Sequence, residues 1–320
     1  MSSRQLLRLV LLVQLLVACA IVAGAVRAGA APWQAVATGV ASVVLVRLAI
    51  NANNFVMSRR VASPTPPEYQ IGVLAAVRMF GEEFGASMLS SSWHMPRARP
   101  RTRIHRGCTT PPVLLLHGYG CNAGYWAYLT PRLDAAGISH ATLDLEPLTG
   151  DIDGFAAAIE AGATRLRREA GAQQVIVVGH SMGGLAARAW LRRHGSAHAA
   201  GVITLGTPHH GTCLAAFGIG INAMQMRRTG VDGPACTWLC DLDAHEDAAT
   251  RARITSIYTH HDNIVAPQTS SHLAGARNIE LGGVGHVALG RNRRVLALVM
   301  DEIARLQTAC PATPVLHGAA

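Results

Sequence analysis

The residues best suited to covalent chemistry lie in the pentapeptide G-H-S-M-G at residues 179–183. An apolar run, Val175–Val178, directly precedes it and predicts a buried strand, and the segment Leu185–Arg193 after it predicts a helix. A serine on a sharp turn between a strand and a helix projects its hydroxyl clear of the sheet, where a base can activate it. Flanking glycines let the strand and the helix approach without a Cβ clash. The pattern therefore predicts a nucleophilic Ser181, and the alternative is a non-catalytic glycine-rich turn.

The segments that must position this serine alternate in type from residue 112 onward. Short apolar runs predict strands at Val113–Leu116, Ala141–Leu145, Val175–Val178, Val202–Leu205, Ile254–Tyr258 and Ile279–Leu281. Longer helix-like segments lie near residues 121–136, 152–170, 182–194 and 291–308. Continuously apolar strands that alternate with helices indicate a parallel sheet that is covered on both faces. We therefore expect an α/β fold with a mostly parallel sheet over residues 112–308.

Three further motifs follow predicted strands. They are H-G-Y-G at residues 117–120, G-T-P-H-H-G at residues 206–211 and D-N-I-V-A-P at residues 262–267. Together with the serine pentapeptide, these motifs make residues 112–308 resemble the α/β-hydrolase superfamily, and specifically the bacterial triacylglycerol lipases and esterases. The resemblance does not extend to the N-terminal third of the chain.

The resemblance implies a catalytic triad of Ser181, Asp262 and His286. This fold requires the chain order serine, acid, histidine. Asp262 closely follows a predicted strand in a D-x-x-V-x-P loop, and His286 follows a glycine-rich turn at residues 282–285, just before the last predicted helix. Of the other acids in this interval, Glu280 is expected within a strand. The rest are expected on a solvated surface: Asp232, Asp241, Asp243, Glu246 and Asp247.

The resemblance also implies how the reaction intermediate is stabilised. The main-chain amides of Tyr119 and Met182 are expected to bind the oxyanion, and the residues expected to support that loop and the serine turn are His117, Gly118, Gly179 and Gly183. Hydrolysis of an acyl ester through an acyl-enzyme needs no metal and no organic cofactor. Acyl transfer to another acceptor on the same triad is an alternative, and an inert membrane interaction protein is another.

Residues 212–250 form an insertion that is longer than an ordinary connection. It is partly apolar, which predicts either a packed cap or a lid over an acyl pocket. Phe217, Trp238 and, just before the insertion, His209 are candidates for substrate binding. An acyl ester or a lipid is the expected substrate.

Two apolar stretches occupy the N-terminus. Leu9–Val26 is free of charge, and a second charge-free run, Ala28–Val46, follows Arg27. Because a membrane-spanning helix needs about 20 mostly apolar residues, residues 1–57 are expected to be a membrane anchor, with two transmembrane helices as the favoured arrangement. A single spanning helix and a cleaved signal peptide are the alternatives.

The arginines around these stretches bear on topology. Arg4 and Arg8 precede the first run, and Arg47, Arg59 and Arg60 follow the second. Because basic residues stay on the cytoplasmic side, we expect a bacterial-type inner-membrane protein with a cytoplasmic hydrolase domain. A single anchor or a signal peptide would instead make that domain periplasmic or secreted.

Residues 58–111 are expected to be a connector with a loosely amphipathic helix over 68–90 and an arginine-rich strip over 97–106. This strip is either a solvated linker or a contact to anionic lipid headgroups.

Half of the chain is hydrophobic and 15% is charged, which excludes a disordered chain. The net charge of +9 has no nucleic-acid-reading motif beside it, so no nucleic-acid partner is expected, and protein partners are unknown.

Seven unevenly spaced cysteines exclude a disulfide-rich small domain, and no His or Cys pair completes a zinc site with Cys236 and Cys240. Residues 309–320 are expected to be a tail.

Overall fold

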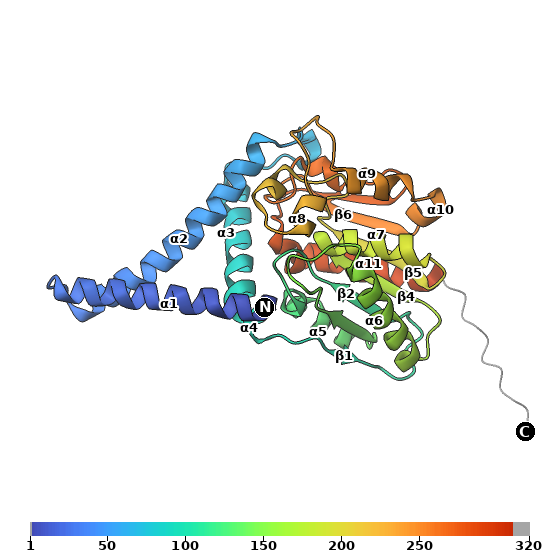
Figure 1. Cartoon of the computed structure of the whole chain (residues 1–320), viewed down its shortest axis with the longest axis horizontal. Helices are drawn as coiled ribbons and strands as arrows, with labels where there is room; N and C mark the ends of the chain where they lie inside the picture. Colours follow the sequence, from blue (N-terminus) through green and yellow to red (C-terminus); the bar gives the residue numbers. More distant parts are fainter. Residues whose placement is uncertain (1, 310–320) are drawn as a thin grey trace, which may run out of the picture.

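The computed structural model describes residues 2–309, so all but the first residue of the expected tail lies outside the described part. Two long helices, α1 (Ser3–Arg27) and α2 (Pro32–Arg60), form a hairpin that projects from the globular part of the chain (Figure 1). Both are long and apolar enough to cross a membrane. The second helix continues 14 residues beyond the predicted run, to Arg60. The two helices pack against each other. None of the most apolar window of α1 is buried inside the structure.

The connector is more ordered than the sequence predicted. After the short turn η1 (Pro67–Tyr69), the amphipathic helix α3 runs over Val73–Leu89, followed by a π turn, η2 (Ser90–His94), and by α4 (Met95–Arg97). The arginine strip is exposed but is not a free linker. Part of it forms the edge strand β1 (Thr102–Arg103), which pairs antiparallel with β3 (His140–Leu143). Strand pairing thus fixes this part of the strip to the sheet, while its arginine side chains stay exposed.

Seven strands form one sheet in the order β1-β3-β2-β4-β5-β6-β7. The six predicted strands are all present, as β2 (Val113–Leu116), β3 (His140–Leu143), β4 (Val175–His180), β5 (Ala199–Leu205), β6 (Ile254–Thr259) and β7 (Arg277–Leu281). Every neighbouring pair among these six is parallel. The prediction of a mostly parallel sheet is confirmed, and the carboxyl ends of the strands meet at one edge.

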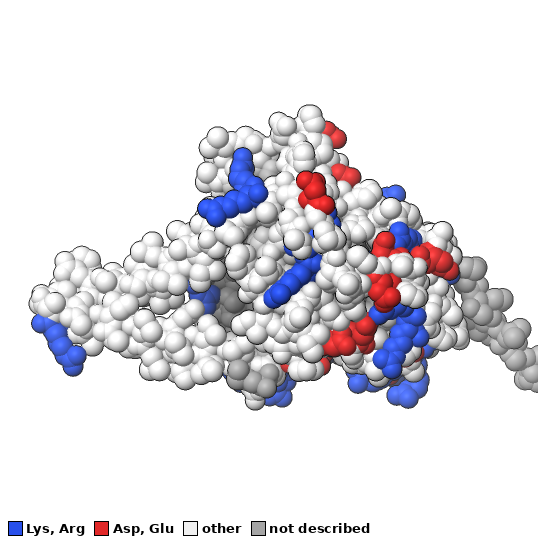
Figure 2. Space-filling view, turned by 45° about the horizontal axis from the view of Figure 1, so that its top comes forward, with Lys and Arg blue, Asp and Glu red and all other residues white. Residues whose placement is uncertain are grey.

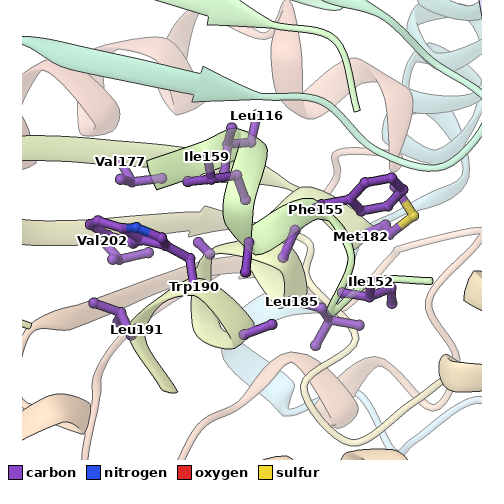
Figure 3. Close-up of a cluster of buried hydrophobic side chains, with 14 of the residues drawn as sticks. Leu116, Ile152, Phe155, Ile159, Val177, Met182, Leu185, Trp190, Leu191 and Val202 are labelled. Carbon is purple, nitrogen blue, oxygen red and sulfur yellow. The ribbon is translucent and has the colours of Figure 1, made fainter. Parts of the chain in front are cut away.

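The side chains of each strand alternate between two hydrophobic cores, as the two-residue period of a strand requires. Leu116 and Val177 pack with α6 (Phe155–Ala170) and α7 (Met182–His194) on one face (Figure 3). Leu115 and Val178 pack on the other face, against η3 (Ala123–Tyr128), α5 (Thr130–Ala135) and α11 (Arg293–Ala309). The helix predicted over residues 121–136 is thus divided into η3 and α5.

The insertion after β5 contains four short helical segments: η4 (Cys213–Phe217), α8 (Ile221–Gln225), α9 (Thr237–Ala244) and α10 (Ala248–Arg251). A buried ion pair ties it to the domain. The guanidinium of Arg188 on α7 is fully buried and donates two hydrogen bonds of 2.7 Å to the carboxylate of Glu246, whose side chain is 1% exposed. The expectation that the acids of this insertion are solvated was therefore wrong for Glu246, because it neutralises a buried cation.

This ion pair gives a stability prediction. Arg188→Ala should lower the free energy of unfolding by about 3–5 kcal/mol, because it leaves the Glu246 carboxylate buried without its two hydrogen bonds and with only Arg251 at 3.5 Å. Arg277→Ala is the matched control, since Arg277 is 55% exposed and its partner Glu302 keeps Arg305. That change should cost about 1 kcal/mol or less. Chemical denaturation of the detergent-solubilised protein measures both, and equal losses would contradict the interpretation.

Candidate active site

Ser181 lies on the turn between β4 and α7, with φ 54° and ψ −125°. Among the residues of the described chain, it is the only non-glycine residue with a positive φ. Glycines make this turn possible. A Cβ on Gly179 would lie 2.6 Å from the backbone nitrogen of Gly184, and one on Gly183 would collide with the carbonyl oxygen of Leu116. The predicted strand-turn-helix arrangement around Ser181 is therefore present, and the strain marks the turn as a functional candidate.

Asp262 and His286 form a buried pair beside this turn. Oδ2 of Asp262 lies 2.7 Å from Nδ1 of His286, and the two residues are 2% and 4% exposed. Oδ1 of Asp262 accepts hydrogen bonds from the backbone amides of Ile264 and Val265, at 2.8 and 2.7 Å. Asp262 follows β6 and His286 follows β7, so both lie at the same edge of the sheet as Ser181. The chain thus brings its three predicted triad residues to one edge.

Two residues next to the serine turn contact the pair of Asp262 and His286: His180 lies close to His286, and Gly206 lies close to Asp262. The Nε2 atom of His180, the residue before Ser181, lies 3.2 Å from the carbonyl oxygen of His286. A Cβ on Gly206 would lie 3.1 Å from Oδ2 of Asp262. The carbonyl of Leu205, the residue before Gly206, accepts a 2.8 Å hydrogen bond from the amide of Ser181.

The electrostatic surroundings of the two histidines differ. Burial acts to lower the pKa of His286, but the charge of Asp262 and its hydrogen bond, with the charge of Glu83, raise that pKa above its usual value. Burial, together with the charge of His286, holds the pKa of His180 well below its usual range. His286 is therefore suited to accept and hold a proton, whereas His180 stays neutral.

The loop after β2 passes directly over the serine. A Cβ on Gly118 would lie 2.9 Å from Cβ of Ser181. Nε2 of His117 accepts a hydrogen bond from the amide of Leu145 at 2.9 Å, so its Nδ1 carries the proton and donates to the carbonyl of Gly118 at 2.9 Å. In a trans peptide the next amide points away from that carbonyl. His117 thereby fixes the direction of the Tyr119 N–H group.

The two residues whose amides are expected to bind the oxyanion, Tyr119 and Met182, both lie beside Ser181. Met182 is the first residue of α7, and the first amides of a helix have no acceptor within the helix. Tyr119 lines the same cavity as Ser181. The hydroxyl of Tyr119 donates to the carbonyl of Ile219 at 2.8 Å and accepts from its amide at 3.0 Å, which links the loop to the insertion.

Ser181 opens into a cavity of about 480 Å³. Its lining is mainly apolar and comes from the insertion and from the loop after Asp262: Leu214, Ala215, Phe217, Ala223, Met226, Ile264 and Val265. The side chain of Phe217 is 72% exposed at this cavity. The structure therefore places Phe217 where the sequence analysis expected it.

His209 and Trp238 do not line this cavity, contrary to the prediction for both. His209 is fully buried, with Nε2 3.2 Å from the hydroxyl of Thr204 and its carbonyl bonded to Arg188. The indole N–H of Trp238 donates to Asp153 at 2.8 Å. Polar partners outside the cavity hold both residues in place. The tertiary structure determines which partners these are, so the local sequence does not reveal them.

The sequence analysis missed Glu83 on α3. This carboxylate is fully buried and accepts hydrogen bonds from the amides of Val287 at 3.0 Å and Ala288 at 2.8 Å, the two residues after His286. A Cβ on Gly285 would lie 2.6 Å from Oε2 of Glu83. Glu83 shares the buried face of α3 with Met79 and Ala86, but the sequence did not mark this face, because other apolar residues of the helix are exposed.

One group of side chains has the composition of a metal site. His105, Asp134 and His140 offer ligand atoms that lie within 4.8 Å of one another, at the edge of the sheet where β3 begins. The Nε atom of Arg103 lies 3.8 Å from Oδ1 of Asp134, the oxygen that His105 also contacts, and it would compete with a metal ion for this oxygen.

Cys236 and Cys240 are free thiols, as are the other four cysteines in the described part of the chain; Cys310 falls outside it.

Comparisons with known proteins bear on the fold. Residues 111–233 match the family model for the alpha/beta hydrolase fold. The lipase BlEst2 of Bacillus licheniformis, in its mature form, superposes with a TM-score of 0.53 at 20% identity, covering 64% of this chain and 98% of that one. Lipase B of Aspergillus fumigatus gives 0.51 at 20% identity, covering 61% of this chain and 52% of that one. The globular part of this chain therefore has the α/β-hydrolase fold, as predicted, and it resembles lipases and esterases in that fold.

Proposed function

We propose that this protein is a serine hydrolase that cleaves carboxylic esters of acyl chains, with Ser181, His286 and Asp262 as its triad. The observation that supports this most directly is the buried 2.7 Å contact between Asp262 and His286 beside a serine on a strained turn. The mainly apolar cavity at Ser181 suits an acyl chain better than a polar metabolite. The likeness in fold to lipases and esterases points the same way.

The proposed reaction follows from the placement of these groups. His286 takes the proton of the Ser181 hydroxyl while the serine oxygen attacks the ester carbonyl, and Asp262 stabilises the imidazolium that forms. The amides of Tyr119 and Met182 hold the oxyanion, each worth about 2.7–4 kcal/mol if it acts as such donors usually do. His286 then gives its proton to the leaving alcohol. Water, deprotonated by His286, attacks the acyl-enzyme and releases the acid and the free serine.

The triad is tested by substitution. Ser181→Ala should lower ester turnover by about 10⁶-fold and abolish labelling by a fluorophosphonate probe, because it removes the nucleophile. Asp262→Asn should cost less, about 10⁴-fold, because the nucleophile stays but the imidazole is held in the wrong tautomer. Glu280→Gln is the control, since Glu280 contacts His260 at 2.7 Å instead of His286, and it should keep most of the activity. Near-normal turnover in a folded Ser181→Ala or Asp262→Asn protein would refute the assignment.

Glu83 is proposed as a positioning residue for His286. If His286 is the base, activity falls as the pH drops through its pKa, which the charge of Glu83 helps to raise. Burial raises the pKa of Glu83 as well, and the amides of Val287 and Ala288 and the charge of His286 oppose that rise and favour the charged carboxylate. Glu83→Gln should therefore move the acid limb of the kcat/KM profile to lower pH, besides lowering kcat. Glu82→Gln is the matched control, because Glu82 contacts Asn292 and not the loop after His286. A loss of activity without any shift of the limb would mean that Glu83 has only a structural role.

We also propose that α1 and α2 anchor the protein in a bacterial-type inner membrane, with the globular part in the cytoplasm. In support, the apolar window of α1 is not covered by the rest of the chain, unlike a core helix. The arginines at both ends of the hairpin outnumber the single Arg27 near its tip, which favours both ends on the cytoplasmic side.

The topology proposal predicts weak activity of a periplasm-dependent reporter fused after residue 320. It also predicts that the full-length protein stays with the membrane fraction after washing at high salt, because hydrophobic insertion does not depend on ionic strength. Strong reporter activity would favour a single anchor or a cleaved signal peptide and would place the enzyme outside the cytoplasm.

A further inference from the structure

One face of α2 lines three successive hollows between the hairpin and Ser181. The residues of this face, called the lining face below, are Val40, Val43, Val44, Arg47, Ile50, Asn51, Asn54 and Met57. Their spacing of three and four residues places them on one side of the helix. From Val40 to Met57 the face is about 25 Å long, at about 1.5 Å per residue. A single helical surface thus runs from the apolar hairpin to the catalytic cavity.

The hollow nearest to Ser181 is the catalytic cavity itself. Asn53, Asn54 and Met57 of α2 form part of its wall, opposite the apolar side chains of the insertion. The segment η4 of the insertion packs against α2. The pocket that would hold the acyl chain is therefore completed by a helix outside the α/β-hydrolase fold, and by the same helix that is apolar enough to cross a membrane.

The second hollow has a volume of about 210 Å³ and lies between α1, α2 and α3. It shares Asn54 with the catalytic cavity, and it shares Arg47, Gln14 and Leu11 with a groove along the hairpin. The Oδ1 atom of Asn51, a residue 5% exposed in this hollow, has no hydrogen-bond partner within residues 2–309. Because an unpaired buried polar atom is costly, this oxygen is suited to bind a water at the polar side of the hollow, which Gln14, Arg47 and Asn54 also line.

The outer rim of the catalytic cavity is apolar and exposed. Phe217, Ile219, Ile221 and Met224 are 54–76% exposed, on and beside η4 and α8. Figure 1 shows α8 on the side of the globular part that faces the hairpin. In Figure 2 the visible hairpin surface is mostly uncharged, with a few basic and no acidic side chains, whereas the acidic groups gather on the globular part. An exposed apolar rim next to an apolar hairpin is suited to contact the same bilayer.

We propose that the lining face of α2 guides an acyl chain of a bilayer glycerolipid sideways from the membrane into the Ser181 cavity, with Asn54 at the passage between the two hollows. The lipid keeps its apolar chain along Leu7, Val10, Leu11 and Ile50 as it passes the second hollow, while Arg47 on the polar side stays bonded to Gln14 and Ser91. This inference rests on the proposed ester hydrolysis and adds the source of the substrate, its route and the residues that control it.

The first test compares two tryptophan variants of full-length protein in phosphatidylcholine vesicles. Asn54→Trp should narrow the passage and lower, at least tenfold, the ratio of kcat/KM for vesicle lipid to kcat/KM for soluble p-nitrophenyl acetate. Val56→Trp is the matched control, since Val56 lies two and a half turns from Arg47 and hence on the opposite side of α2. Its ratio should stay within about twofold of the wild type. An unchanged ratio in Asn54→Trp, or an equal fall in both variants, would overturn the route.

A second test does not depend on catalysis. Phosphatidylcholine with a photoreactive group at the end of one acyl chain is incorporated into vesicles with the Ser181→Ala protein, and cross-linked peptides are mapped. We expect labels on residues inside the cavity, such as Met57 and Met226, and fewer of them in Asn54→Trp. Labels confined to the outer surface of the hairpin would overturn the proposal even if soluble esters are cleaved. Absence of acetate hydrolysis with internal labelling would instead refute the proposed function and leave the lipid route standing.

Discussion

The left-handed backbone of Ser181 is the constraint on which the site depends. Such a conformation costs about 1–3 kcal/mol and persists only where the surroundings over-determine it. Here β4 enters the turn, α7 leaves it, and the loop after β2 passes so close that a Cβ on Gly118 would lie 2.9 Å from Cβ of Ser181. The parallel sheet supplies this support, because the strands on both sides of β4 end at the same edge. The loops that carry Asp262 and His286 start from that edge as well.

The parts of the site that depend on local sequence were predictable. A strand, a glycine-flanked serine and a helix are consecutive in the chain, and a turn of that kind is determined by steric effects among neighbours. The continuous apolar runs were sufficient for the strands, since a parallel sheet with both faces covered leaves no polar alternation. Phe217 lines the Ser181 cavity, whereas Trp238 of the same insertion does not.

The errors concern contacts between segments that are distant in sequence. Arg188 and Glu246 are 58 residues apart, and neither shows in its own neighbourhood that it is buried. Trp238 looked like a pocket residue because it is large and apolar, yet its indole N–H is taken up by Asp153. Glu83 is the most instructive case. Its place on the buried face of α3 was not visible in the sequence, because the apolar Leu74 and Val77 of this helix are exposed, and its partners, Val287 and Ala288, lie more than 200 residues away.

The position of Glu83 has a consequence for where the protein can be divided. Helix α3 looks like a spacer between anchor and enzyme, yet it carries a carboxylate that binds the loop of His286. A shortened protein that begins at the first strand of the fold would lack this carboxylate and leave two buried amides without an acceptor. The boundary between the hairpin and a self-sufficient globular part therefore lies before α3, between Arg60 and Ser63, whose amide donates to the side chain of Gln268. Cutting there removes the hairpin and with it one wall of the Ser181 cavity, so the shortened protein would have an open pocket.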